Sequence, residues 1–157
     1  MRYLAGIPSV FWLALLLHNP GEEGNGPNMS AEIIRGKRIL VVEDEPLIAG
    51  LLGDMLMADG HDVDAVNTGR AALERLASQA YDLIVSDLRM PVLDGRGLYR
   101  ELQARHPEML RRILFVTGSA LDPGNEEFLA RTRVPWLAKP FTINDLHCLT
   151  QKVLAGV

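Results

Sequence analysis

Four short apolar runs, each followed closely by a polar residue, constrain the fold of this sequence more than any other feature. The runs are rich in Val, Ile and Leu, and they are Arg38–Val42, Leu83–Ser86, Ile113–Val116 and Pro135–Ala138. They alternate with stretches of helical spacing, a pattern typical of parallel strands buried on both faces. In an open parallel sheet the ligand site lies beyond the carboxyl ends of the strands. The residues that follow these runs are therefore expected to meet at one edge of a sheet.

The stretches between the runs complete a strand–helix alternation from Gly36 onward. Pro46 suits the first position of a helix that ends near Gly60, and Thr142 with Asp145 resembles a capping box before a last helix. In chain order we expect helix 46–60, strand 61–67, helix 70–79, strand 81–86, helix 97–106, helix 123–131 and helix 143–154. Right-handed crossovers then favour a doubly wound α/β fold, with five parallel strands in the order 2-1-3-4-5 and five helices.

Length, charge and cysteine content narrow the class of protein. The 157 residues suit one domain with an extension, and a content of 48% hydrophobic and 23% charged residues is ordinary for a globular protein. The net charge of −4, with no basic run, disfavours DNA binding by this chain. The only cysteine, Cys148, cannot form an internal disulfide, which fits a reducing cytoplasm.

The first 35 residues differ in character from the rest. Ile7–Leu17 is apolar but shorter than the about 20 residues that a membrane span needs, and it lacks the charge and cleavage site of a signal peptide. The stretch 18–30 (HNPGEEGNGPNMS) has the composition of a flexible linker. We expect a poorly ordered extension over residues 1–35 and a folded domain over residues 36–157. The alternatives are that the protein starts at Met29, or that the apolar stretch is the last strand of a preceding domain.

Three acids, a hydroxyl and an ammonium stand at or just beyond the apolar runs: Glu43, Asp44, Asp87, Thr117 and Lys139. Mg²⁺ is usually held by one or two carboxylates, several waters and a phosphate. We expect Asp44 and Asp87 to supply the carboxylates. Without the metal, such clustered acids repel one another, which raises at least one pKa. This set of residues suits a site that holds a divalent cation and moves a phosphoryl group.

Individual roles follow from the chemistry of each group. Asp87 ends the central strand, so it is the best nucleophile for forming an acyl phosphate. The Lys139 ammonium suits a phosphate oxygen, and the Thr117 hydroxyl can donate to another. Glu43 is expected to reach the metal through water, and the backbone carbonyl of Arg89 to complete the protein ligands.

Taken one at a time, these residues have plainer explanations. Adjacent acids after a strand often belong to a solvated loop, and a lone Asp there is more often a turn former. A lone Thr is more often a helix cap, and Lys139 before Pro140 could be surface charge. Their joint occurrence at four strand ends of one sheet favours the phosphoryl site.

Four motifs resemble the receiver domain of two-component response regulators. They are ILVVEDE at 39–45, DLIVSDLRMPVLDG at 82–95, ILFVTGSA at 113–120 and WLAKPF at 136–141, in a chain that matches from Lys37 to about Leu154. The resemblance implies a flavodoxin-like fold and a phosphorelay function. It implies phosphorylation of Asp87 to 4-aspartylphosphate by a histidine kinase or a histidine phosphotransfer protein. It also implies Mg²⁺ at Glu43, Asp44 and Asp87, with Thr117 and Lys139 as phosphoryl-binding switch residues.

Two further residues enter through this resemblance. Trp136 stands where the family has a switch aromatic, usually Tyr or Phe, and an indole is larger and needs a partner for its N–H when buried. Both an altered switch and a simple surface aromatic stay open. The family has a cis peptide bond before the matching proline, and we expect Lys139–Pro140 to be cis, at a cost of roughly 0.5–1 kcal/mol.

The leading prediction is a phosphorylation-dependent signalling switch that is not an enzyme toward other substrates and acts on a downstream protein. A receiver tail of a hybrid histidine kinase, or a phosphate sink, are alternatives within the same class. A flavin- or nucleotide-binding module needs a phosphate-cradling Gly/Ser/Thr loop, and the acidic loop 43–46 does not provide one. A phosphatase with an Asp nucleophile would need a second acid soon after Asp87.

Overall fold

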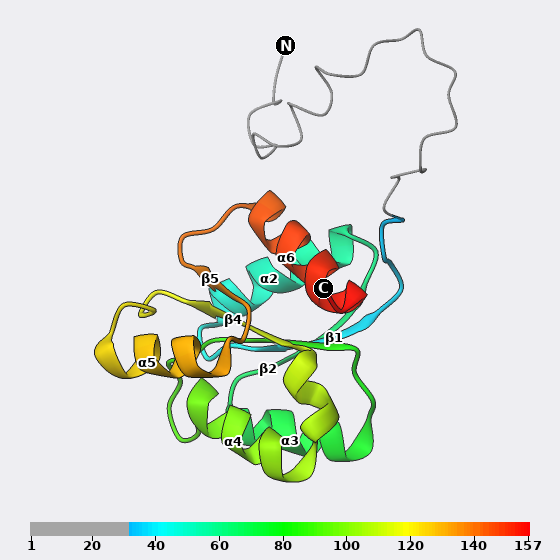
Figure 1. Cartoon of the computed structure of the whole chain (residues 1–157). Coiled ribbons are helices and arrows are strands. Elements are labelled where there is room, and N and C mark those ends of the chain that lie inside the picture. The colour runs from blue at the N-terminus through cyan, green and yellow to red at the C-terminus, as the bar shows by residue number, and fades with distance from the viewer. Residues whose placement is uncertain (1–31) are drawn as a thin grey trace, which may run out of the picture. The chain divides into compact units, whose positions relative to one another are not determined.

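The computed structural model describes residues 32–157, within which Ile34–Val157 form one compact unit. Its centre is a parallel sheet in the order β2-β1-β3-β4-β5 (Figure 1). The strands are β1 (Arg38–Val42), β2 (Asp62–Val66), β3 (Leu83–Ser86), β4 (Ile113–Thr117) and β5 (Trp136–Ala138). The predicted flavodoxin-like fold and strand order are confirmed.

Helices cover both faces of the sheet. The helices are α2 (Pro46–Ala58), α3 (Gly69–Ser78), α4 (Gly95–Arg105), α5 (Pro123–Thr132) and α6 (Ile143–Ala155), with a 3₁₀ helix at Pro107–Arg111 that the sequence reading missed. Helices α2 and α6 pack on one face, and α3, α4 and α5 pack on the other (Figure 1). The five predicted helices are all present, with ends that differ from the expected ones by at most two residues.

The first strand shows why the apolar runs are continuous rather than alternating. Ile39 and Val41 face the core that contains α2 and α6, whereas Leu40 and Val42 face the core that contains α3, α4 and α5. Side chains alternate between the two faces of a strand, and here both faces are dry. All four residues are fully buried.

Side-chain caps set where several helices begin. Thr142 and Asp145 form the predicted capping box, in which the Thr142 hydroxyl accepts from the Asp145 N–H at 3.1 Å. The Asp94 carboxylate accepts from the Gly97 N–H at 2.7 Å, so α4 begins at Gly95, two residues earlier than expected.

Part of the predicted extension is held against the domain. The Ile34 N–H donates to Gln151 Oε1 at 2.8 Å, and Gln151 Nε2 donates to the Ile34 carbonyl at 2.8 Å. Residues 1–31, on which most of the predicted extension falls, lie outside the described residues. Within 32–157, none of the helices has the length and hydropathy that crossing a membrane requires.

Gly95 lies where the main chain of Asp87–Leu88 and the ring of Phe115 pass very close. A Cβ at this position would stand 2.6 Å from the Asp87 carbonyl oxygen, 2.8 Å from Leu88 Cα and 2.9 Å from Phe115 Cε1. Two of these neighbours are main-chain atoms, which cannot move aside as a flexible side chain could. The absence of a side chain at Gly95 therefore lets α4 start directly against the end of β3.

Gly95→Ala is expected to lower the free energy of unfolding by about 1–3 kcal/mol, because the added methyl group overpacks the junction of β3 and α4. Gly50→Ala is the matched control: Gly50 lies exposed in α2 with open space around its Cβ direction. That change should raise the unfolding free energy by roughly 0.5–1 kcal/mol through helix propensity. Urea unfolding of both variants measures the difference, and equal effects would contradict the packing argument.

Candidate functional site

The hydrogen bonds of the sheet continue one residue beyond the strands and position the site. The Glu43 N–H donates to the last carbonyl of β2 at 3.0 Å, and the Asp87 N–H donates to the last carbonyl of β1 at 3.0 Å. The Lys139 N–H donates to the Thr117 carbonyl at 2.9 Å. The side chains of these residues thus start from ordered main chain at the carboxyl edge of the sheet.

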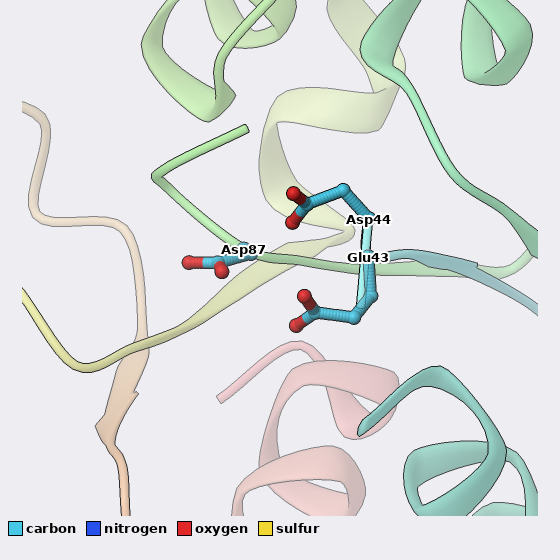
Figure 2. A group of neighbouring side chains, drawn as sticks. All are labelled: Glu43, Asp44 and Asp87. Carbon is cyan, nitrogen blue, oxygen red and sulfur yellow. The ribbon is translucent and has the colours of Figure 1, made fainter. Parts of the chain in front are cut away.

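Three carboxylates converge at this edge. One oxygen from each of Glu43, Asp44 and Asp87 lies within 4.8 Å of the others, and Figure 2 shows the three groups pointing into a common space. Glu43 is 2% exposed and Asp87 8% exposed, whereas Asp44 faces solvent. Oxygen ligands at this spacing suit a hard divalent cation such as Mg²⁺.

Lys139 joins two of these acids from the end of β5. Its Nζ lies 2.8 Å from Glu43 Oε2 and 3.1 Å from Asp87 Oδ2. Burial raises the pKa of Glu43, although the hydrogen bond from Lys139 opposes this shift. Burial by itself lowers the pKa of Lys139, but the hydrogen bond to Glu43 and the charge of Asp87 outweigh it and raise the pKa. The Lys139 side chain therefore stays protonated beside the acids.

The Asp87 carboxylate is held at both oxygens. Oδ2 accepts from the Lys139 ammonium, and Oδ1 accepts from the Arg89 N–H at 3.1 Å. A carboxylate with both oxygens bonded has one preferred orientation, and it lies beside the carboxylates of Asp44 and Glu43 at the sheet edge (Figure 2). The structure thus brings together four of the residues that the sequence singled out: Glu43, Asp44, Asp87 and Lys139.

Thr117 lies at the same edge of the sheet, but its hydroxyl bonds to Ser119. It is 1% exposed, and its Oγ1 lies 3.1 Å from Ser119 Oγ and accepts from the Ser119 N–H at 3.1 Å. Asn125 Nδ2 donates to the Ser119 carbonyl at 2.9 Å and to Ser119 Oγ at 3.0 Å. The Thr117 hydroxyl is therefore tied into the connection between β4 and α5 in this state.

Sequence reasoning missed Ser119 and Asn125. Asn125 is 8% exposed, but nothing in the sequence separates it from Glu126 and Glu127, which follow it in the first turns of the same helix and are exposed. Its burial depends on the packing of α5 against the β4–α5 connection, which the local pattern does not encode.

The remaining predicted residues have distinct surroundings. Trp136 is 41% exposed at the start of β5, where its main chain pairs with Phe115, and its indole makes no hydrogen bond or ring contact with residues in the described part of the chain. The Lys139–Pro140 peptide bond is cis, as predicted. The Arg89 side chain turns to Asp122, with 2.8 Å between Nη2 and Oδ2.

Comparisons with known proteins identify the family of the chain. The family model for the response regulator receiver domain matches residues 39–151. The chain is 33% identical over 131 residues to the transcriptional regulatory protein TcrA of Mycobacterium tuberculosis, covering 78% of this chain and 48% of TcrA. It is 33% identical over 118 residues to the response regulator receiver protein CpdR of Brucella abortus, covering 75% of this chain and 97% of CpdR. The chain thus spans about half of TcrA and nearly all of CpdR.

Solved structures point the same way. The receiver domain of the sensor histidine kinase PA1611 of Pseudomonas aeruginosa, solved with a magnesium ion in its active-site cleft, has a TM-score of 0.69 and 34% identity, covering 76% of this chain and 98% of its own. The chemotaxis response regulator CheY4 of Vibrio cholerae has a TM-score of 0.67 and 26% identity, covering 75% of this chain and 98% of its own. This chain belongs to the response regulator receiver domain family, a phosphoacceptor switch of two-component signal transduction rather than a catalytic enzyme.

Proposed function

We propose that Asp87 accepts a phosphoryl group, in an Mg²⁺-dependent reaction, from a histidine kinase or a histidine phosphotransfer protein. The observation that carries this proposal is the pair of contacts from Lys139, 2.8 Å to Glu43 and 3.1 Å to Asp87, beside the carboxylate of Asp44. An ammonium held against the nucleophile is already in place for the oxygens of an incoming phosphoryl group.

The transfer is an in-line exchange at phosphorus. A carboxylate oxygen of Asp87 forms a bond to phosphorus while the bond from phosphorus to the donor imidazole nitrogen breaks, and the electron pair of that bond stays on the imidazole. Charge spreads over the phosphoryl oxygens in the transition state, so catalysis consists mainly of placement and electrostatic stabilisation. The Arg89 N–H orients the carboxylate, and the Lys139 ammonium offsets the charge.

The acid cluster fits a divalent cation. Three carboxylates face one ammonium, so the site carries excess negative charge that would repel a phosphoryl donor. We propose that Asp44 and Asp87 hold Mg²⁺ directly, with Glu43 acting through water and the Arg89 carbonyl completing the protein ligands. The bound ion would neutralise the acids and orient the phosphoryl group. The magnesium reported in the cleft of the PA1611 receiver domain supports this assignment.

Modification is proposed to change a protein-binding surface. Thr117 and Trp136 are the proposed switch residues: the hydroxyl now bonds to Ser119, and the indole is exposed. Both side chains are proposed to adopt another arrangement once a phosphoryl group offers new acceptors near Lys139. A downstream protein, rather than DNA, is the proposed target of the described domain.

Asp87 is expected to be the sole acceptor. Incubation with acetyl phosphate and Mg²⁺ should add one phosphoryl group by intact mass, and Asp87→Asn should abolish the addition, since an amide is not a nucleophile toward phosphorus. Asp94→Asn is the control, because it alters a nearby acid of the same loop while keeping a side chain that can cap α4. Phosphoryl addition to the Asp87→Asn chain would show that the assignment is wrong.

Mg²⁺ affinity is expected to depend more on Asp44 and Asp87 than on Glu43. The Glu43 carboxylate is engaged by Lys139, so Glu43→Gln should weaken binding by only about tenfold, as for groups that act through a directly bound ligand. Asp44→Asn should weaken it more, because a direct ligand is lost. Calorimetric titration with Mg²⁺ gives the order, and a chain that binds normally as Asp44→Asn but not as Glu43→Gln would reverse it.

Lys139→Gln is expected to lower the free energy of unfolding by about 1–3 kcal/mol, because it leaves the buried Glu43 carboxylate without its cation. Added Mg²⁺ should restore part of the loss by supplying positive charge at the same acids. Lys152→Gln, at an exposed position of α6, is the control and should leave stability within about 0.5 kcal/mol of the parent. The argument fails if the two lysine variants unfold alike.

A further inference from the structure

We propose that the Arg89 guanidinium changes partner when Asp87 is phosphorylated: it leaves Asp122 and binds the phosphoryl group, and the freed Asp122 carboxylate caps helix α5. The inference rests on the proposed phosphorylation of Asp87. It assigns a role to an ion pair that lies outside the cluster formed by the three acids and Lys139.

The Arg89–Asp122 pair is close but solvent-exposed. Nη2 and Oδ2 are 2.8 Å apart, while the two side chains are 76% and 50% exposed. Ion pairs in such surroundings contribute little stability, because water and salt screen them and two long side chains lose freedom. A stronger anion nearby can therefore displace Asp122.

Arg89 starts beside the place where that anion would form. Its main-chain N–H donates to Asp87 Oδ1 at 3.1 Å, so its side chain begins next to the carboxylate that would carry the phosphoryl group. A phosphoryl group carries more negative charge than one carboxylate and offers three acceptor oxygens. The planar guanidinium binds such groups through paired hydrogen bonds, so the phosphoryl group is the better partner.

Asp122 shows the other half of the exchange. It occupies the N-cap position of α5 with extended main chain (φ −64°, ψ 132°), yet its side chain accepts no capping hydrogen bond. Asp94, in the same position of α4, accepts from a main-chain N–H of its helix at 2.7 Å. Asp is among the preferred N-cap residues, so Arg89 holds Asp122 away from the bond that it would otherwise make.

Once freed from Arg89, Asp122 would act on the segment that contains Thr117. The Asp122 N–H donates to the Ser119 carbonyl at 3.1 Å, and the Asn125 side chain bonds to the same carbonyl at 2.9 Å. Ser119 in turn bonds to the Thr117 hydroxyl. A change of partner at Asp122 would therefore act on the β4–α5 connection at its α5 end, whereas Thr117 lies at its β4 end.

The competition is tested with beryllofluoride as the phosphoryl analogue, at saturating Mg²⁺, followed by ¹⁹F NMR of the intact chain. Arg89→Gln is expected to weaken binding by about threefold to fivefold, the range that exposed charge pairs support. Asp122→Asn should instead strengthen binding by about twofold to threefold, because a competitor for Arg89 is lost while the capping ability of the side chain is kept. Arg96→Gln, which removes another exposed arginine near Asp122, is the control and should bind like the parent.

The double variant separates the exchange from simple electrostatics. If Asp122 acts only by holding Arg89, Arg89→Gln with Asp122→Asn should bind like Arg89→Gln alone. If Asp122 only repels the anion through space, Asp122→Asn should strengthen binding equally in the parent chain and in Arg89→Gln. That result would overturn the proposal.

Hydrogen exchange at the Gly124 amide, in the first turn of α5, gives a second readout. In the parent chain this amide should become more protected when beryllofluoride binds. In Arg89→Gln this amide should be protected already without the ligand, since Asp122 is free to cap. In Asp122→Ala, beryllofluoride should cause no gain in the protection of this amide. An Arg89→Gln chain that binds beryllofluoride as the parent does would overturn the exchange while leaving phosphorylation of Asp87 standing. Failure of the parent chain itself to bind would overturn both.

Discussion

The parallel pairing of all five strands, β1 to β5, is the constraint on which the site depends. Parallel neighbours bring their carboxyl ends to one edge, and here the pairing continues through the main chain of Glu43, Asp87 and Lys139. A slip of one residue in any strand would turn its side chains to the opposite face. Both faces of the sheet are buried under helices, so the packing of two cores holds the register that aligns the functional groups.

Charge balance explains why Lys139 belongs to the resting site. Three clustered carboxylates, of which those of Glu43 and Asp87 are buried, repel one another, and burial raises the pKa of Glu43. The ammonium offsets part of this repulsion by contacting Glu43 and Asp87 together. The remaining negative charge is what a divalent cation would neutralise. The same arrangement that stabilises the unmodified chain therefore prepares it for an anionic substituent.

Much of this could be read from the sequence because the decisive signals are local. Continuous apolar runs identified the central strands, and polar residues directly after them marked the edge of the sheet. That reasoning correctly brought Glu43, Asp44, Asp87 and Lys139 together. Helix ends such as the capping box of α6 were also predictable, because the residues that form them are near neighbours in the chain.

The side-chain partners were decided only by the tertiary structure. Asp122 stands at the N-cap position of α5, yet its side chain pairs with Arg89, 33 residues earlier in the chain. Asn125 is buried against Ser119, although Glu126 and Glu127, which follow it in the chain, are exposed. Gln151 bonds to Ile34 across 117 residues. The sequence by itself determined the elements, their order and the chemistry available at the strand ends, since these depend on composition and short-range spacing. Which donor meets which acceptor depends on how separate segments pack, and that physical information exists only once the chain is folded.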